Sequence, residues 1–253
     1  DLVFVATGEN YPDALSAAAA AAYLGAPVLL TKKGELPPVV KSRLGALDPD
    51  VIYVLGSSAS ISNSVFNALK SYAPTVQRLQ GADRYETGRE IIKKAWGVNG
   101  NGDGAENVNL ASVVIATGKN FPDALSAAAA VGSVGGAVVL VDGSASSIPT
   151  ATLNVIRDLE PQEVVIAGQS SAVKSSIETQ LKGVFPGKVV RKAGADRYAT
   201  SVAITDHYFN DADAVFFAVG TNFPDALAGA ALAGSLGAPL LVAEKSCVSS
   251  STK

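Results

Sequence analysis

The chain has 253 residues, 48% of them hydrophobic, and a formal net charge of −3. This length and apolar content suffice for a sizeable buried core, and the acidic balance excludes a general basic surface for nucleic acid. The alanine-rich stretches are too short and too weakly hydrophobic to span a bilayer, and the single cysteine, Cys247, excludes an internal disulfide framework or a cysteine metal cluster.

Short apolar runs alternate with helical segments along the whole chain. The first part predicts strands near 2–6, 27–31, 51–55 and 75–79, and helices near 14–22, 38–47 and 60–72. A further helix is expected to follow the segment Gly81–Thr87 and to run to about Trp96. The second part predicts strands near 112–117, 137–141, 163–167 and 188–192, and helices near 122–134, 148–159, 170–182 and 196–209. The last part predicts strands near 214–217 and 239–242 around one helix. Strict β–α alternation predicts parallel sheets covered by helices.

One motif occurs three times, as Gly8–Ser16, Gly118–Ser126 and Gly220–Ala228. Residues 3–20 and 113–130 are identical at 14 of 18 positions, and residues 215–232 match the first copy at 11 of 18. Such long self-similarity at a nearly fixed period indicates a repeated structural unit.

Each copy of this motif follows a predicted strand and precedes an alanine-rich helix. We expect the leading glycine to adopt positive φ, the asparagine to cap the helix, the proline to occupy its first turn and the aspartate to meet the helix dipole. These residues are Gly8, Gly118 and Gly220; Asn10, Asn120 and Asn222; Pro12, Pro122 and Pro224; and Asp13, Asp123 and Asp225. Capping alone explains them, but the carboxyl end of a parallel strand is also where α/β sheets bind ligands.

The helix over residues 14–22 has no charged face. A helix that is apolar all round is buried on most sides, and small side chains allow another backbone to approach closely. We therefore expect it to pack between its own sheet and another repeat.

A second motif occurs twice, as Gly81–Thr87 and Gly194–Thr200, each containing Asp-Arg-Tyr. Three copies of the first motif and two of the second correspond to about two and a half units of a three-unit array. We place the repeats at 1–80, 81–193 and 194–253. A further Asp-Arg-Tyr segment is expected before Asp1, and the rest of the last unit after Lys253.

The irregular loop at 97–107 offers oxygen ligands at Asn99, Asn101 and Asp103, as a calcium loop does. Its closing acidic position falls on Leu110, so a solvated insertion is the favoured interpretation and no metal site is predicted.

The repeated motifs together resemble the cell wall binding repeat type 2 family. The resemblance rests on Asn-Phe-Pro-Asp-Ala-Leu-Ser, on Leu-Gly-Ala-Pro-Val-Leu-Leu at 24–30, on Val-Leu-Gly after the third strand and on Gly-Ala-Asp-Arg-Tyr-Glu-Thr. It implies three Toprim-like or Rossmann-like α/β units around a pseudo-threefold axis. The second repeat departs from the family pattern, since Ala137 replaces the proline found at Pro27 and Pro239.

The resemblance also implies a function, namely non-covalent attachment of a secreted protein to an anionic polymer of a Gram-positive cell wall. That polymer would be teichoic-acid-like or a secondary polysaccharide. No cofactor, nucleic acid or membrane insertion is implied, and any catalytic domain would lie elsewhere in the polypeptide. The repeats would pack on one another within the chain.

An anionic polymer needs local positive sites, which arginine and helix N-termini provide, and tyrosine rings pack on sugars. The candidate polymer-binding residues are Arg84, Arg197, Tyr85, Tyr198, Asn10, Asn120, Asn222, Asp13, Asp123 and Asp225. The alternative is that the arginines pair with carboxylates, Arg84 with Asp83 or with Asp123 across a repeat boundary, and hold the repeats together.

Two other classes of protein compete with a wall anchor. One is a surface-layer assembly scaffold that shares the fold without a polymer site. The other is a nucleotide-binding Rossmann-like enzyme, but the chain lacks a Gly-x-Gly-x-x-Gly or phosphate-loop motif. Its only histidine, His207, has no neighbouring nucleophile motif, so we expect no catalytic residue in this chain.

Overall fold

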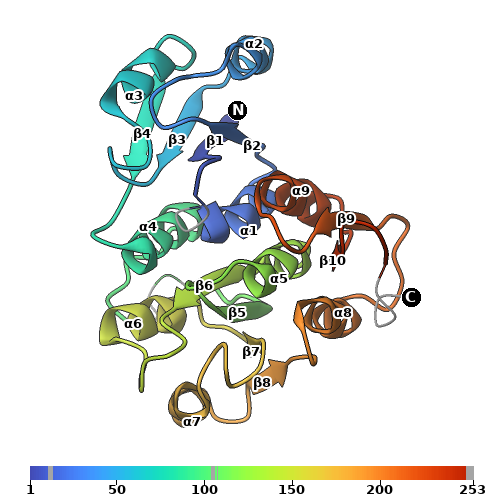
Figure 1. Cartoon of the computed structure of the whole chain (residues 1–253). Coiled ribbons are helices and arrows are strands. Elements are labelled where there is room, and N and C mark those ends of the chain that lie inside the picture. The colour runs from blue at the N-terminus through green and yellow to red at the C-terminus, as the bar shows by residue number, and fades with distance from the viewer. Residues whose placement is uncertain (11–13, 104–105, 107, 249–253) are drawn as a thin grey trace.

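The computed structural model describes residues 1–10, 14–103, 106 and 108–248, and its elements alternate between strand and helix (Figure 1). The first unit contains β1 (Leu2–Thr7), α1 (Leu15–Tyr23), β2 (Val28–Thr31), α2 (Pro38–Leu47), β3 (Val51–Leu55), α3 (Asn63–Leu69) and β4 (Thr75–Leu79), followed by α4 (Arg84–Trp96). The second contains β5 (Ser112–Thr117), α5 (Pro122–Gly132), β6 (Ala137–Val141), α6 (Thr150–Asp158), β7 (Glu163–Ala167), α7 (Ser175–Val184) and β8 (Val189–Lys192), followed by α8 (Arg197–Tyr208). The third contains β9 (Phe216–Val219), α9 (Pro224–Ser235) and β10 (Leu240–Ala243).

Each unit is built on its own parallel sheet. The strand order is β2-β1-β3-β4 in the first unit and β6-β5-β7-β8 in the second, while β10 and β9 pair in the third. The first and second sheets share the same order, which confirms the predicted tandem α/β repeats. The Toprim-like description and the three repeat boundaries stay predictions.

The three alanine-rich helices meet at the centre of the molecule. α1, α5 and α9 pack pairwise on one another, and each also contacts the second strand of another unit: α1 contacts β6, α5 contacts β10 and α9 contacts β2 (Figure 1). This cyclic order is the predicted pseudo-threefold arrangement. The residues of α1 from Leu15 to Ala22 are all buried, as expected for a helix between its own sheet and other repeats.

Close approach of these helices depends on their smallest side chains. A Cβ added at Gly132 or at Gly234 would lie 2.8 Å from the Cβ of Ala22, closer than real Cβ contacts allow. Interiors are packed at crystal-like density, so larger side chains here would separate the helices.

Two further helices, α4 and α8, connect the units. α4 lies against α1, β6 and α6, and α8 lies against α5 and β10 (Figure 1). Each of them therefore spans from the alanine-rich helix of one unit to the edge strand of the next sheet.

The expected positive φ at Gly8, Gly118 and Gly220 is wrong. The left-handed glycines at strand ends are Gly56 after β3 and Gly168 after β7, with φ of 86° and 90°. Gly118 and Gly220 are needed for space instead, because an added Cβ would lie 2.7 Å from Cε1 of Tyr85 and 2.9 Å from Cε1 of Tyr198.

Replacing Gly132 by valine is predicted to destabilise the chain by about 1–3 kcal/mol, the usual cost of overpacking a core. Urea unfolding measures this free energy. Gly45→Ala in α2 is the control, because no atom lies within 4 Å of its added Cβ, and it should gain up to about 1 kcal/mol. Equal effects of the two changes would contradict close helix packing at the axis.

Candidate functional site

Two equivalent cavities of about 190 Å³ each lie at the carboxyl ends of strands. One follows β5 and β7 beside the start of α8, and the other follows β1 and β3 beside the start of α4. We call them the second pocket and the first pocket after their sheets. In a sheet of this order the point between the first and third strands is where ligands bind in open α/β folds.

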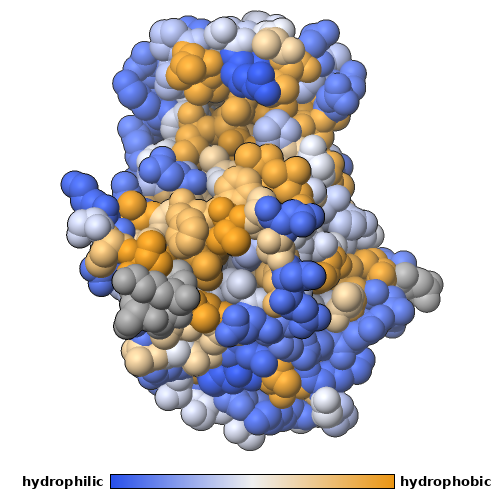
Figure 2. All heavy atoms as spheres, turned by 90° about the vertical axis from the view of Figure 1, so that its right-hand side faces the viewer, coloured by the Kyte–Doolittle hydropathy of each residue, from blue (hydrophilic) through white to orange (hydrophobic). Residues whose placement is uncertain are grey.

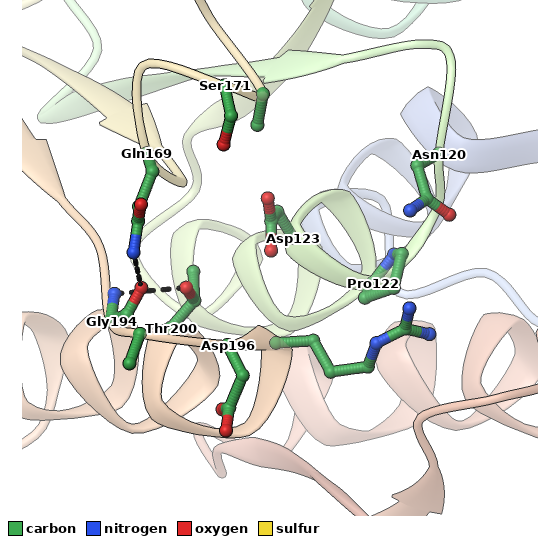
Figure 3. A pocket seen from close by; sticks show the side chains of 11 residues that line it. Asn120, Pro122, Asp123, Gln169, Ser171, Gly194, Asp196 and Thr200 are labelled. Carbon is green, nitrogen blue, oxygen red and sulfur yellow. Dashed lines mark hydrogen bonds between the residues drawn. The ribbon is translucent and has the colours of Figure 1, made fainter.

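Asp123 forms the centre of the second pocket. It belongs to the first turn of α5, and its side chain points into the space between Gln169 and Ser171 (Figure 3). The lack of a side chain at Gly168 makes this possible, because a Cβ there would lie 2.3 Å from Oδ2 of Asp123. The backbone after β7 therefore shapes the pocket around this carboxylate.

Burial raises the pKa of the Asp123 carboxyl above its ordinary value of 3.8, and the positive charge of Arg197 opposes part of this effect. Desolvation disfavours the charged form of a carboxyl, and a neighbouring cation favours it. The pocket thus holds a carboxyl whose charge is weakly solvated.

The Asp-Arg-Tyr aspartates are helix caps. The carboxylate of Asp83 accepts hydrogen bonds from the backbone N–H groups of Tyr85 and Glu86, at 2.9 and 2.8 Å. Asp196 accepts one from the N–H of Ala199 at 2.8 Å. These bonds satisfy backbone donors at the starts of α4 and α8.

The arginines of the same motif join neighbouring units. Arg84 donates to the carbonyl oxygen of Gly118 at 2.6 Å, and Arg197 donates to that of Gly220. These contacts support the interpretation that the arginines hold repeats together, with backbone carbonyls of the next unit as acceptors. The pairing of Arg84 with Asp83 or Asp123 stays a prediction. A role of these arginines in polymer binding stays a prediction.

The asparagines are not the predicted N-caps. The N-cap positions of α5 and α9 are Phe121 and Phe223, without a side-chain cap. Oδ1 of Asn120 accepts from the N–H of Phe121 at 3.0 Å, so it bends the chain just before the helix begins. Pro122 and Asp123 do lie in the first helical turn, as predicted.

The structure separates the predicted site residues among three places. Asn120, Asp123 and Arg197 line the second pocket, and Asn10 and Arg84 line the first. Asn222 and Asp225 are exposed at the start of α9, and Asp13 lies outside the described residues. Tyr85 and Tyr198 pack against the core beside Gly118 and Gly220 rather than lining either pocket among the described residues.

Four polar residues that line the pockets were not predicted as site residues from the sequence: Gln169, Ser171, Ser57 and Ser60. Gln169 donates from Nε2 to the carbonyl of Gly194 at 2.6 Å (Figure 3). Each side chain follows the third strand of its sheet, so equivalent turns after β3 and β7 were the signal that could have found them.

The positively charged side chain of Lys119 lies next to the second pocket. A neighbouring cavity of about 280 Å³ shares Asn120, Asp123 and Ser171 with it and is also lined by Lys119. Nζ of Lys119 lies 2.8 Å from Oδ1 of Asp142, and this contact, together with hydrogen bonds from Ser144, lowers the pKa of Asp142 to about 2. Both side chains are largely exposed, so solvent screens the pair.

In the loop after α4, the side-chain amide oxygens of Asn99 and Asn101 accept hydrogen bonds from backbone groups of the same loop. Oδ1 of Asn99 accepts from the N–H of Asn101, and Oδ1 of Asn101 accepts from the N–H of Asp103. Carboxylate oxygens of Asp103, Glu106 and Asp158 lie within 4.8 Å of one another, a grouping that sequence spacing did not suggest.

His207 contacts Glu163, Nε2 to Oε2 at 2.7 Å, and thereby ties α8 to the start of β7.

The sequence matches the family model described as cell wall binding domain 2 (CWB2) over residues 2–66, 78–178 and 191–253. The chain is 30% identical to the amidase enhancer of Bacillus subtilis (strain 168) over 251 residues, 99% of this chain and 32% of that protein. It is 26% identical to N-acetylmuramoyl-L-alanine amidase LytC of the same organism over 226 residues, 89% of this chain and 42% of that protein. The chain therefore spans less than half the length of these curated relatives.

Solved structures show the same architecture. Cwp6 from Clostridium difficile superposes with a TM-score of 0.87 at 26% identity, over 99% of this chain and 38% of that one. Cwp8 from the same organism superposes with a TM-score of 0.84 at 23% identity, over 99% and 41%. Within the part of the chain that the structure describes, no helix combines the length and hydrophobicity that crossing a membrane requires.

Arg84→Ala is predicted to lower the free energy of unfolding by about 1–3 kcal/mol, because the carbonyl of Gly118 loses its charged donor. Urea titration followed by tryptophan fluorescence measures the change. Arg43→Ala, at an exposed position of α2, is the control and should change stability by less than about 0.5 kcal/mol. An Arg84→Ala variant as stable as this control would show that the contact does not hold the units together.

Asp123→Asn tests the raised pKa of this half-buried carboxyl. A carboxyl with a raised pKa favours the folded state while protonated, and this contribution disappears as pH rises from about 3.8 through the folded-state pKa. The variant should therefore gain stability relative to the parent chain as pH rises from 4 to 7. Asp225→Asn, at the equivalent but exposed position of α9, should show a smaller change. Parallel pH–stability curves of Asp123→Asn and the parent would rule out the raised pKa.

Proposed function

The chain belongs to the cell wall binding domain 2 family, and we propose that it anchors a longer secreted polypeptide by binding an anionic secondary polymer of a Gram-positive cell wall. Cell wall binding follows from the family itself. The class of polymer, the non-covalent mode of attachment, the secreted location and the anchored cargo are the proposal. The relatives named for amidase functions are longer than this chain, which fits a module that accompanies other domains.

The observation that carries the proposal is the pair of equivalent pockets at the unit junctions. Each pocket combines the strand ends of one sheet with the start of the helix that leads to the next unit. The same residue classes recur in both, an asparagine, a serine, an aspartate, an arginine and a threonine. Two copies of one polar pocket suit a ligand that itself repeats, and binding at both would raise the overall affinity by avidity.

The second pocket offers groups that bind sugar hydroxyls. Asn120 and Gln169 contribute side-chain amides, and Ser171 contributes an exposed hydroxyl. Amides both donate and accept hydrogen bonds, which matches the hydroxyls of a polysaccharide or polyol phosphate. Asp123 would accept a hydrogen bond from such a hydroxyl.

Positive groups lie beside these polar ones. The guanidinium of Arg197 lies close enough to affect Asp123, and Lys119 borders the adjoining cavity. Arginine, lysine and the N-terminal turn of α5 are sites to which phosphate or carboxylate groups bind. The raised pKa of Asp123 reduces the repulsion that its carboxylate would exert on an anionic ligand.

An enzymatic role for these pockets finds little support in their chemistry. His207 is engaged with Glu163, away from both pockets, and Cys247 is exposed beyond β10. The described pocket residues lack a nucleophile paired with a base, which acyl-transfer chemistry needs. A surface-layer scaffold without a polymer site is the remaining competitor, and the binding experiment separates the two.

Co-sedimentation with Gram-positive cell walls, intact and stripped of their secondary polymers, tests the proposal. The chain should bind intact walls saturably, lose binding to stripped walls and bind more weakly as salt rises. Combined Asn120→Ala and Ser171→Ala changes should weaken binding at least about fivefold, because two neutral hydrogen bonds contribute about 1–3 kcal/mol together.

The matched control combines Asn67→Ala and Ser176→Ala, at exposed positions of α3 and α7 outside both pockets. It should bind like the parent chain. Equal binding to stripped and intact walls would contradict a polymer ligand, and a pocket variant that binds as well as the control would place the site elsewhere.

A further inference from the structure

One arginine of the first sheet reaches across the end of the neighbouring strand. Arg78 lies in β4, and its guanidinium donates from Nη1 to the carbonyl of Gly56 at 2.8 Å and from Nη2 to that of Ile61 at 3.0 Å. These two carbonyls mark the start and the end of the turn over residues 56–61, which follows β3 and which we call the β3 turn. One planar group therefore joins both ends of this turn.

The second sheet repeats this arrangement. Arg191 in β8 donates from Nη1 to the carbonyl of Gly168 at 2.7 Å and from Nη2 to that of Val173 at 2.9 Å. The turn over residues 168–173 follows β7, and we call it the β7 turn. Both turns begin with a glycine in the left-handed region, at φ of 86° and 90°. The same bridge in both sheets shows that it belongs to the repeated unit rather than to one local surface.

Each turn carries polar side chains of a pocket. Ser57 and Ser60 of the β3 turn line the first pocket, and Gln169 and Ser171 of the β7 turn line the second (Figure 3). All four lie between the two carbonyls that an arginine holds. On the side of the molecule where α8 lies, the surface below the level of α9 is mostly hydrophilic (Figure 2). Polar side chains are common on such a surface, so a pocket needs them held in place rather than merely present.

The two guanidinium groups have different partners on their other side. Cζ of Arg78 lies 4.8 Å from the ring centroid of Phe66 in α3, a cation–π contact. Nε of Arg191 donates to Oε2 of Glu178 in α7 at 2.8 Å, and both side chains of this pair are mostly buried. Phe66 and Glu178 hold equivalent positions, because each follows the last residue of its turn by five positions. Two unlike side chains at one position therefore support the same bridge.

A shift of the β7 turn would reach the second pocket directly. A Cβ on Gly168 would lie 2.3 Å from Oδ2 of Asp123, so the start of the turn lies against this carboxyl. Within the turn, the N–H groups of Ala172 and Val173 donate to the carbonyl of Gln169 at 2.9 and 3.0 Å. These backbone bonds shape the turn internally, whereas the guanidinium fixes its two ends relative to β8. Loss of the bridge would leave a formed turn that is free to move against Asp123.

We propose that Arg78 and Arg191 are positioning residues, each holding the turn after the third strand of its sheet so that the polar side chains of this turn meet a ligand in the pocket. This inference rests on the proposed polymer binding at the two pockets. The arginines act through the turns, since neither is among the described residues that line a pocket. Lysine cannot replace them, because a single ammonium group lacks the planar fork that reaches two carbonyls.

Arg191→Lys tests the proposal in the 253-residue chain, because it removes the fork and keeps the charge. Under conditions where circular dichroism shows the variant fully folded, its affinity for intact Gram-positive cell walls in co-sedimentation should fall at least about fivefold, as for the loss of two hydrogen bonds to the ligand. Amide NMR signals of residues 169–172 should move, while those of residues 57–60 stay as in the parent chain. The control is Lys192→Arg, which also keeps the charge, lies next to Arg191 in β8 and lines neither pocket. It should match the parent in both measurements.

Changes at Glu178 decide the question if Arg191→Lys does not fold. Glu178→Ala removes the support of the guanidinium and should weaken wall binding, whereas Glu178→Phe supplies the kind of ring that holds Arg78 and should bind like the parent. A folded Arg191→Lys chain that binds like the control would overturn the inference and leave the proposed function standing, as would equal binding by the two Glu178 variants. A parent chain that does not bind walls would reject the proposed function and, with it, this inference.

Discussion

The three alanine-rich helices approach one another so closely that their contacts tolerate little beyond a methyl group. Gly132 and Gly234 both face Ala22, and α1 is buried along almost its whole length. This packing fixes the three sheets around one axis. Because each alanine-rich helix begins at a strand end, the same packing also decides where the strand ends lie.

The junctions between units derive from this arrangement. Arg84 and Arg197 reach backbone carbonyls of the following unit, and their aspartates cap the helices that carry them. The pockets lie beside these contacts, so the same residues that hold units together also form the rim of the proposed polymer site. Structural and binding interpretations of Asp-Arg-Tyr are therefore compatible: the aspartate caps the helix and the arginine bridges two units. In the second copy the charge of Arg197 also acts on Asp123.

Repetition made most of the fold predictable from the sequence, because each strand and helix could be checked against its copy. Local geometry was harder to predict. The helix expected at 170–182 begins only at Ser175, since the chain first makes a tight turn in which Ala172 donates to the carbonyl of Gln169. That turn brings Gln169 and Ser171 to the pocket. The spatial role of Gly118 was not predictable either, because it depends on a tyrosine 33 positions earlier in the chain.

Backbone amide NMR of the chain, titrated with purified secondary wall polymer, tests the central claim most directly. The account predicts that the shifted signals cluster at the ends of β5 and β7 and at the start of α8, around Asn120, Gln169 and Gly194, with a second cluster around Ser57 and Gly81. Signals from α3 and α7 away from these turns should stay unchanged. Shifts confined to other surfaces, or none at saturating polymer, would contradict binding at the unit junctions.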